Sequence, residues 1–451
     1  MKQRSFPRWQ CLAVLVMLAW PSTAFALDII PVTSPGGIRA WLVEDHRRPI
    51  ITVMVRFPTG SVADPAGREG LVHLATGLFD EGAGDLASDA FRASLEEQSI
   101  ALGFAARRES LTMSLMTLTE TSDLAFKLAH LALSRPRFDP GPLERVRNQV
   151  IAGIRARRER PGTITWRTWW TSAFPGHPYS RPLRGTIDSL RRITRDDLLA
   201  LAPDLLARDG VLVAAVGDIT PDRLGSVLDD MLGDLAGSPV RVPVPEVAHA
   251  RPGAVTVVDR DLAQSVIVFG HDGIGRDDPD WYAAVILFEV LAGGHGSRLR
   301  KELRETRGLT YSVSAGPVLF DHAALVTGRV STGNSRAAET IAHIRAVWRD
   351  FAANGPTEQE VHDAKEYIKG SRALRLASSP GIARTLLGIQ VAELGIDYLD
   401  RQPAMVDAVS MHDLRRVAAR LFRERELAFV VVGRPSGVEA THHAPEGPPP
   451  G

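Results

Sequence analysis

The sequence contains one pattern twice, and this repeat limits the possible folds more than any other feature. Residues 193–219 read ITRDDLLALAPDLLARDGVLVAAVGDI, and residues 409–435 read VSMHDLRRVAARLFRERELAFVVVGRP. Each copy has a Ser or Thr before an x-Asp-Leu triplet, then apolar residues at helical spacing, then a run of apolar strand formers. Gly217 and Gly433 close the two copies, 216 residues apart. The pattern predicts a capped helix followed by a buried strand at the end of each of two similar halves.

The beginnings of the two halves also correspond. Residues 37–61 and 254–273 each show a strand, a polar turn and a second strand, which predicts a β-hairpin in each half. A helix is expected after each, at about residues 68–79 and 279–292. We therefore expect an α+β protein with two homologous domains in tandem. Each domain would be a mainly antiparallel sheet packed with helices, and the two would face each other across a cleft.

The first residues have the composition of a secretory signal peptide rather than of a folded element. A basic segment with Lys2 and Arg4 precedes the apolar run CLAVLVMLAW at residues 11–20, and small residues end at Ala26. The apolar run is short for a membrane span, and no later segment is long and apolar enough for one. The sequence predicts an exported protein that has no membrane span after the signal peptide is cleaved.

Composition shifts give the domain boundaries. A segment rich in proline at residues 236–253 predicts a linker between the halves. The predicted parts are a signal peptide (1–26), an N-terminal domain (27–235), the linker (236–253), a C-terminal domain (254–436) and a disordered tail (437–451).

Charge and cysteine content exclude several functions. The formal net charge is zero, so nothing in the overall charge indicates a nucleic-acid partner. The arginine-rich stretch at residues 145–162 also has apolar residues at helical spacing, which favours a solvated helix face. The single cysteine, Cys11, lies in the signal peptide. The exported chain therefore has no thiol for catalysis and no cysteine ligand for a metal.

The segment GLVHLATGLFDEGAG at residues 70–84 is similar to a zinc-binding helix from which parts are missing. In a His-x-x-Glu-His helix the two histidines lie on one face and bind zinc, while the glutamate activates the bound water. Here His73 fills the first ligand position, Thr76 stands at the base position, and Gly77 stands at the second ligand position. We interpret His73 as a packed or hydrogen-bonded residue on a helix face. The alternative is a metal site rebuilt from other side chains, namely Glu69, Asp80, Glu81 and His177.

Three motifs resemble the insulinase/pitrilysin metallopeptidases, in particular the bacterial members similar to mitochondrial processing peptidase. The motifs are GREGLVHLATGLFDEGAG (67–84), FPGHPYSRPLRGT (174–186) and LAGGHGSRLRKELRETRGLTYSVSAG (291–316). The resemblance extends over residues 30–435 and implies the LuxS/MPP-like metallohydrolase fold. It also implies a third zinc ligand, a glutamate, on a later helix. The matching positions here are Ala152 and Gly153.

In active members of that family an Arg and a Tyr seven residues later reach the substrate near the zinc, and they correspond to Arg304 and Tyr311. An arginine offers a fixed fork of donors to peptide carbonyls, and a tyrosine hydroxyl can donate to an oxyanion. A structural interpretation stays open for both. Arg304 could be a surface residue paired with Glu302 and Glu305, and Tyr311 could pack in the core as the start of a strand.

The resemblance implies a non-catalytic, substrate-binding subunit of an exported heterodimeric zinc metallopeptidase, with the periplasm as its expected location. The chain itself would hold no cofactor and would be inactive alone. Zinc is expected in a homologous partner subunit, whose site would receive Arg304 and Tyr311, and the substrate would be a peptide or an unfolded polypeptide. One alternative is a scaffold or peptide-binding protein without peptidase activity. A second is an autonomous zinc peptidase with atypical ligands.

Overall fold

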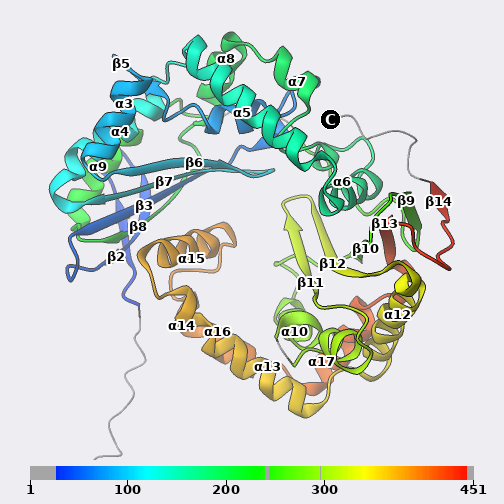
Figure 1. The fold of residues 1–451 in the computed structure, drawn as a ribbon. Coiled ribbons are helices and arrows are strands. Elements are labelled where there is room, and N and C mark those ends of the chain that lie inside the picture. Colours follow the sequence, from blue (N-terminus) through cyan, green and yellow to red (C-terminus); the bar gives the residue numbers. More distant parts are fainter. Residues whose placement is uncertain (1–26, 239–242, 295, 444–451) are drawn as a thin grey trace, which may run out of the picture.

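The repeat appears in the structure as two halves, each built around a six-stranded sheet (Figure 1). The computed structural model describes residues 27–238, 243–294 and 296–443, so the predicted signal peptide lies outside the described residues. The first half contains β1 (Ile30–Thr33), β2 (Arg39–Glu44), β3 (Ile50–Phe57), α2 (Leu71–Thr76), β4 (Gly82–Ala83), β5 (Leu86–Ala87), α3 (Ser88–Glu97), β6 (Ala101–Ala106), β7 (Leu111–Leu118), α4 (Ser122–Ser134), α5 (Pro140–Arg158), α6 (Pro161–Ala173), α7 (Ile187–Arg192), α8 (Arg195–Leu205), β8 (Leu212–Gly217) and α9 (Pro221–Leu232).

The second half repeats this series with small changes. It contains β9 (Val255–Asp259), β10 (Gln264–Asp272), α10 (Trp281–Phe288), the π-helical turn η4 (Glu289–Gly293), α11 (Arg298–Arg300), the π-helical turn η5 (Lys301–Thr306), β11 (Val313–Phe320), β12 (Ala323–Gly333), α12 (Ala337–Asn354), α13 (Glu358–Gly370), α14 (Arg372–Arg375), α15 (Ser379–Val391), α16 (Tyr398–Asp407), α17 (Met411–Leu421), β13 (Ala428–Gly433) and β14 (His442–His443).

The two sheets have the same strand order, which confirms the predicted α+β class and the homology of the halves. The first sheet runs β1-β2-β8-β3-β7-β6, and the second, read from its equivalent edge, runs β14-β9-β13-β10-β12-β11. The pairs β2 with β8 and β9 with β13 are parallel, as is β14 with β9. The other pairs within these two sheets are antiparallel.

The two hairpins predicted at the start of each half are wrong. Strands β2 and β3 are not neighbours, because β8 lies between them, parallel to β2 and antiparallel to β3. Strand β13 separates β9 from β10 in the same way. Both inserted strands are almost wholly buried apolar runs, which suits a central position hydrogen-bonded on both edges. A polar turn between two strands predicts that they are neighbours in the sheet. It carries no information about a third strand, distant in sequence, that pairs between them.

The local signals at the end of each half are confirmed. Thr194 caps α8 and Ser410 caps α17, each in a capping box with the aspartate three residues later. Gly217 and Gly433 end the following strands with φ angles of 133° and 147°. A Cβ atom on Gly217 would lie 2.0 Å from the carbonyl oxygen of Ile50, so only glycine fits there.

Each half also covers the sheet of the other with one helix. Helices α3, α4 and α9 cover one face of the first sheet, and α15 of the second half lies on the opposite face (Figure 1). Leu386 of α15 packs there, and the side-chain amide of Gln390 donates to the carbonyl of Val213 at 3.1 Å. Reciprocally, α6 of the first half packs Ile164 and Trp169 against β10 and β13. The two halves therefore share their cores.

The chain connecting and following the halves is tied to the folded body. The predicted linker has no helix or strand among its described residues, and the N–H of Val247 donates to the carbonyl of His322. The predicted disordered tail, 437–451, is wrong in its first part, because residues 442–443 form β14 and pair with Thr256 and Val257 of β9. The remainder lies outside the described residues. No helix in the described part of the chain is long and apolar enough to cross a membrane.

Candidate functional site

The helix expected to resemble a zinc-binding helix is α2, and it is short. It begins at Leu71 and ends at Thr76, inside the predicted span of 68–79. Gly70 precedes it with a φ angle of 92°, a left-handed conformation that glycine adopts without strain. The buried carboxylate of Asp64 accepts hydrogen bonds from the backbone N–H groups of Gly70 at 2.7 Å and Val72 at 2.8 Å. These bonds satisfy donors that a helix start leaves without partners.

His73 lies half-buried on α2 in a positively charged environment. No side-chain hydrogen bond to its ring is present within the described residues. Burial, with the nearby guanidinium groups of Arg184 and Arg157, lowers the pKa of His73 to about 4. The imidazole is therefore neutral near pH 7. Of the structural roles expected for His73, packing on the helix face is the one the geometry supports.

The two positions that would complete the zinc helix have other local roles. The hydroxyl of Thr76 donates to the carbonyl of His73 at 2.7 Å, so it closes the last turn of the helix. Gly77 follows the end of α2, and a Cβ atom added to it would lie 2.9 Å from Cγ1 of Val146. A histidine at position 77 would require Val146 to move. Helix α5 has therefore packed closely against the position of the missing ligand.

The position of the third ligand, on α5, lacks a carboxylate. Ala152 is exposed, and a Cβ atom added to Gly153 would have no neighbour within 4 Å. Across the described residues, no group of three or more His, Cys, Asp or Glu side chains is placed to hold a metal ion. The residues present at these positions therefore do not fit a catalytic zinc, which needs three protein ligands.

Two residues considered for a rebuilt metal site have structural partners instead. In His177, Nδ1 accepts from the backbone N–H of Tyr179 at 3.1 Å, and Nε2 donates to the carbonyl of Pro245 at 3.0 Å. Glu81 pairs with Arg145 at 2.6 Å. Both nitrogens of His177 are therefore used to hold the segment after α6 against the linker.

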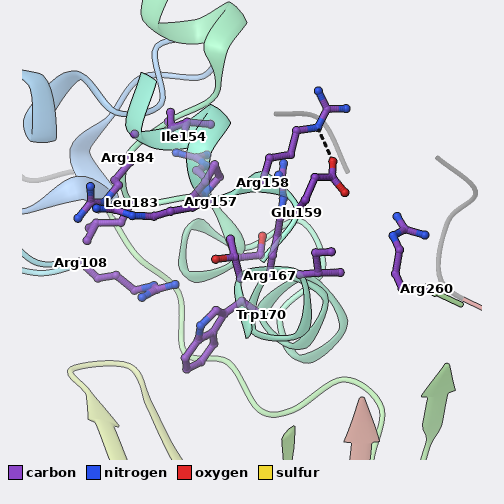
Figure 2. Close-up of a pocket in the computed structure, with 17 residues that line it drawn as sticks. Arg108, Ile154, Arg157, Arg158, Glu159, Arg167, Trp170, Leu183, Arg184 and Arg260 are labelled. Carbon is purple, nitrogen blue, oxygen red and sulfur yellow. Dashed lines mark ion pairs between the residues drawn. The ribbon is translucent and has the colours of Figure 1, made fainter. Parts of the chain in front are cut away.

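A cavity of about 380 Å³ lies where α5, α6 and the segment before α7 meet (Figure 2). Gly153, the third-ligand position, is part of its wall, and Arg157 and Arg184 belong both to this wall and to the surroundings of His73. We call it the arginine pocket. Its charged lining residues are Arg108, Arg157, Arg158, Glu159, Arg167, Arg181, Arg184 and Arg260.

Arg304 and Tyr311 lie together on the second half, at η5 and just before β11. The guanidinium carbon of Arg304 is 4.5 Å from the centre of the Tyr311 ring, a cation–π contact. Tyr311 is 81% exposed, so it does not pack in the core. No hydrogen bond, ion pair or ring contact joins this pair to His73 or to the arginine pocket in the part of the chain that the structure describes.

The two carboxylates considered as partners of Arg304 pair with other groups. Glu302 pairs with Arg307 at 2.6 Å and with His343 at 3.4 Å, and Glu305 pairs with Arg300 at 3.8 Å. Arg304 has no ion pair among the described residues, so its donors are open to a partner outside this chain. The role of Arg304 and Tyr311 in substrate contact stays a prediction.

The fold and the α2 helix define a class: a protein of two similar halves that resembles a zinc peptidase, with Thr76, Gly77 and Ala152–Gly153 at the positions of its base and two of its ligands. Comparison with known proteins agrees with this class. Residues 192–368 match the model of the peptidase M16 inactive domain. The chain is 27% identical over 391 residues to the non-peptidase homolog YmxG of Helicobacter pylori, covering 86% of this chain and 90% of that protein. It is 20% identical over 403 residues to the beta subunit of mitochondrial-processing peptidase of Lentinula edodes, covering 86% of each.

Solved structures show the same fold. A peptidase M16 inactive domain from Pseudomonas fluorescens superposes with a TM-score of 0.84 at 24% identity, covering 92% of this chain and 99% of that one. The periplasmic protease PqqL of Escherichia coli superposes with a TM-score of 0.77 at 16% identity, covering 91% of this chain and 46% of PqqL. The resemblance inferred from the motifs is confirmed as a similarity: this chain resembles peptidase M16 proteins in sequence and shares the fold of a solved peptidase M16 inactive domain.

The arginine pocket is the feature that the sequence did not predict. The expected solvated face of α5 is present at Arg155 and Arg158, but Arg147 is buried and donates to the carbonyl of Ile193 at 2.6 Å. Arg157 faces the pocket. Arginines from five segments of the chain meet there, and residue spacing along any one of these segments does not predict the cluster.

Proposed function

We propose that this chain is the non-catalytic, substrate-binding subunit of an exported heterodimeric zinc metallopeptidase. One contrast carries the proposal. The positions of the base and of two zinc ligands, on or beside α2 and on α5, hold Thr76, Gly77 and Ala152–Gly153, whereas Arg304 and Tyr311 are adjacent and pair with no carboxylate among the described residues. A chain with this combination would suit a partner that supplies the zinc.

The chemistry of the pair suits a site on another chain. An exposed tyrosine hydroxyl can donate to the oxyanion of a tetrahedral intermediate, and an arginine can hold peptide carbonyls with two parallel donors. The cation–π contact between Arg304 and the Tyr311 ring, at 4.5 Å, places the two groups side by side before substrate binds. This reduces the entropy lost when substrate is engaged.

The comparisons support the proposal at the level of the family. A relative that matches 86% of this chain is named a non-peptidase homolog, and the model of the peptidase M16 inactive domain matches residues 192–368. The partner would be a homologous chain with an intact His-x-x-Glu-His helix, which would bind the zinc, and the substrate would be a peptide or an unfolded polypeptide. The predicted signal peptide and the fold shared with a periplasmic protease support export to the periplasm.

The test is co-expression with a homologous chain that carries the intact zinc helix. We expect the two chains to co-purify and to cleave peptides only together. Arg304→Ala and Tyr311→Phe should each lower kcat by about 100- to 1,000-fold, as removal of a transition-state donor does. Lys301→Ala is the matched control, because Lys301 is an exposed cation on the same turn and should leave activity unchanged.

Three outcomes would contradict the proposal. Full activity in both variants would remove the role of Arg304 and Tyr311. Failure of every homologous zinc-bearing chain to co-purify would favour the scaffold alternative. One tightly bound zinc per purified chain, measured by mass spectrometry of the metal without a His tag, would favour the autonomous peptidase.

A further inference from the structure

The arginine pocket has a large excess of positive charge. Seven arginines and one glutamate line it, and the glutamate, Glu159, is exposed and lies 3.8 Å from Arg158. Cations gathered in a cavity repel each other unless an anion is present. The arrangement therefore has a free-energy cost that a bound anion would remove.

Three of the guanidinium groups have no hydrogen-bond or ion-pair partner in the part of the chain that the structure describes. Arg108 and Arg181 donate to the carbonyls of Tyr179 and Asp64, each at 3.0 Å. By contrast, the side chains of Arg157, Arg167 and Arg184 make no hydrogen bond and no ion pair within the described residues.

Two of the unpaired arginines have lowered pKa values. Burial lowers the pKa of Arg167 and of Arg184, and the neighbouring cations Arg158 and Arg157 respectively lower each further. Arginine stays charged at neutral pH despite such shifts. A carboxylate between these groups would reverse both effects, because it would supply the opposite charge and the missing hydrogen-bond acceptors.

The remaining walls distinguish an organic ligand from a mineral anion. Ile154, Ile164 and Leu183 give the pocket apolar walls, and Trp170 adds a ring face on which Arg108 stacks at 4.7 Å. A volume of about 380 Å³ lies in the usual range of ligand sites, roughly 300–1,000 Å³. Apolar walls beside clustered guanidinium groups suit a peptide that carries both carboxylates and apolar side chains.

The position of the pocket connects it with substrate. Its wall includes Gly153, and two of its arginines lie close enough to His73 to lower the histidine's pKa, so it adjoins the altered zinc positions. Arg260 belongs to the second half, and the other lining residues belong to the first, so the pocket lies between the halves (Figure 2).

From these observations we infer that the arginine pocket binds acidic peptide segments. Their carboxylates pair with Arg157, Arg167 and Arg184, and an apolar side chain lies against the aliphatic wall. The inference rests on the proposed function in one respect, since it names the substrate class that a peptide-binding subunit of this kind would select.

The test uses the full mature chain alone, with no partner. A fluorescein-labelled peptide of alternating glutamate and leucine is titrated at low salt, beside the same peptide with glutamine at every glutamate, and binding is measured by fluorescence anisotropy. We expect the glutamate peptide to bind at least about tenfold more tightly, since charged hydrogen bonds contribute about 1.5–3 kcal/mol each. Arg157→Gln and Arg184→Gln should each weaken it by about 10- to 100-fold.

The matched control is Arg155→Gln. Arg155 is exposed, lies on α5 two residues from Arg157 and does not line the pocket, so the variant removes the same charge from the same helix. Its affinity for the peptide should be unchanged. Circular dichroism and urea unfolding of each variant show whether the fold is retained, and a triple variant with Arg167→Gln serves if a single change is too small to resolve.

Equal binding of the two peptides, or equal losses in Arg155→Gln and Arg157→Gln, would overturn the assignment. Displacement of the glutamate peptide by an equal concentration of inorganic phosphate would show a small-anion site and would overturn it as well. Because the test needs no partner subunit, a negative result rejects the pocket assignment without bearing on the proposed heterodimer. If the heterodimer needs Arg304 for activity but the chain alone does not bind the glutamate peptide, only the assignment of the arginine pocket is rejected.

Discussion

Gly77 shows how one position separates this chain from a zinc peptidase. Helix α2 ends immediately before it, and Val146 of α5 fills the space where a second imidazole would begin. His73 has kept its place but has lost the environment of a ligand. It is half-buried, without a hydrogen-bond partner among the described residues, and close to Arg157 and Arg184. The position of the second ligand is therefore closed by packing, and the position of the first lies beside two guanidinium groups.

The surroundings of His73 predict an acid-sensitive contribution to stability. The pKa of His73 is about 4 in the folded protein and about 6.5 in the unfolded chain. Because the unfolded chain takes up the proton more readily, the stabilising contribution of neutral His73 to folding is complete above pH 6.5 and is lost as the pH falls toward 4. In His73→Asn, the loss of unfolding free energy between about pH 7 and about pH 4.5 should be about 2 kcal/mol smaller than in the unmodified chain. Urea unfolding at the two pH values measures it.

A second histidine titrates in the same range. Burial lowers the pKa of His271 to about 4, but His271 is present in both proteins, so its contribution cancels in the difference. Parallel pH profiles for the two proteins would contradict the buried, cationic environment described for His73.

Helices α6 and α15 are the elements that unite the molecule. Each is encoded in one half and covers the sheet of the other. Trp169 of α6 is fully buried, and its ring approaches the second sheet so closely that a Cβ atom on Gly270 would lie 3.1 Å from it. The helix therefore acts as part of the second half's core, although it precedes that half by some eighty residues of chain.

Removal of the Trp169 ring should destabilise the whole protein. Trp169→Ala is expected to lower the free energy of unfolding by about 3–5 kcal/mol, because it leaves a large cavity between α6 and the sheet. Trp166→Ala, on the same helix at a partly buried position, should lower it by less. Urea unfolding followed by circular dichroism measures both, and equal losses would contradict the described packing.

At the scale of elements, sequence reasoning succeeded where a signal is local and failed where it is not. Thr194 and Ser410 were predicted as caps because capping chemistry lies within four residues. The predicted hairpins failed because the partner of β2 and β3 is β8, more than 150 residues later in the chain. The arginine pocket was not predicted for the same reason, since α5, α6 and the segment before α7 meet only in the folded structure.

The candidate site shows the same division. The absence of ligands at Thr76 and Gly77 was predicted from helical spacing, and the structure places both on or beside α2. The adjacency of Arg304 and Tyr311 agrees with the family motif, although the structure alone does not assign their role. Side-chain exposure and ion pairing depend on tertiary packing. The sequence therefore could not predict that Glu302 and Glu305 pair with other arginines and not with Arg304.

The reciprocal packing predicts how the whole molecule responds when it is divided. Residues 27–235 and 254–443, expressed separately, should each be insoluble or unfolded, because each lacks the helix that covers one face of its sheet. Expressed together, they should form a one-to-one complex that elutes from gel filtration like the uncut chain. A stable, cooperatively folding monomer of either piece would contradict this expectation.

The exchange of α6 and α15 also bears on ancestry. If the two halves descend from one half-length chain, that ancestor had a sheet face that its own helix did not cover. Two copies of that chain could have covered each other's exposed sheet face, each with its equivalent helix, as in a domain-swapped pair. The ancestor would then have been an obligate homodimer. Fusion through the linker turned that association into an intramolecular one, which no longer depends on protein concentration. The two halves of such a fused chain could then diverge in sequence independently of each other.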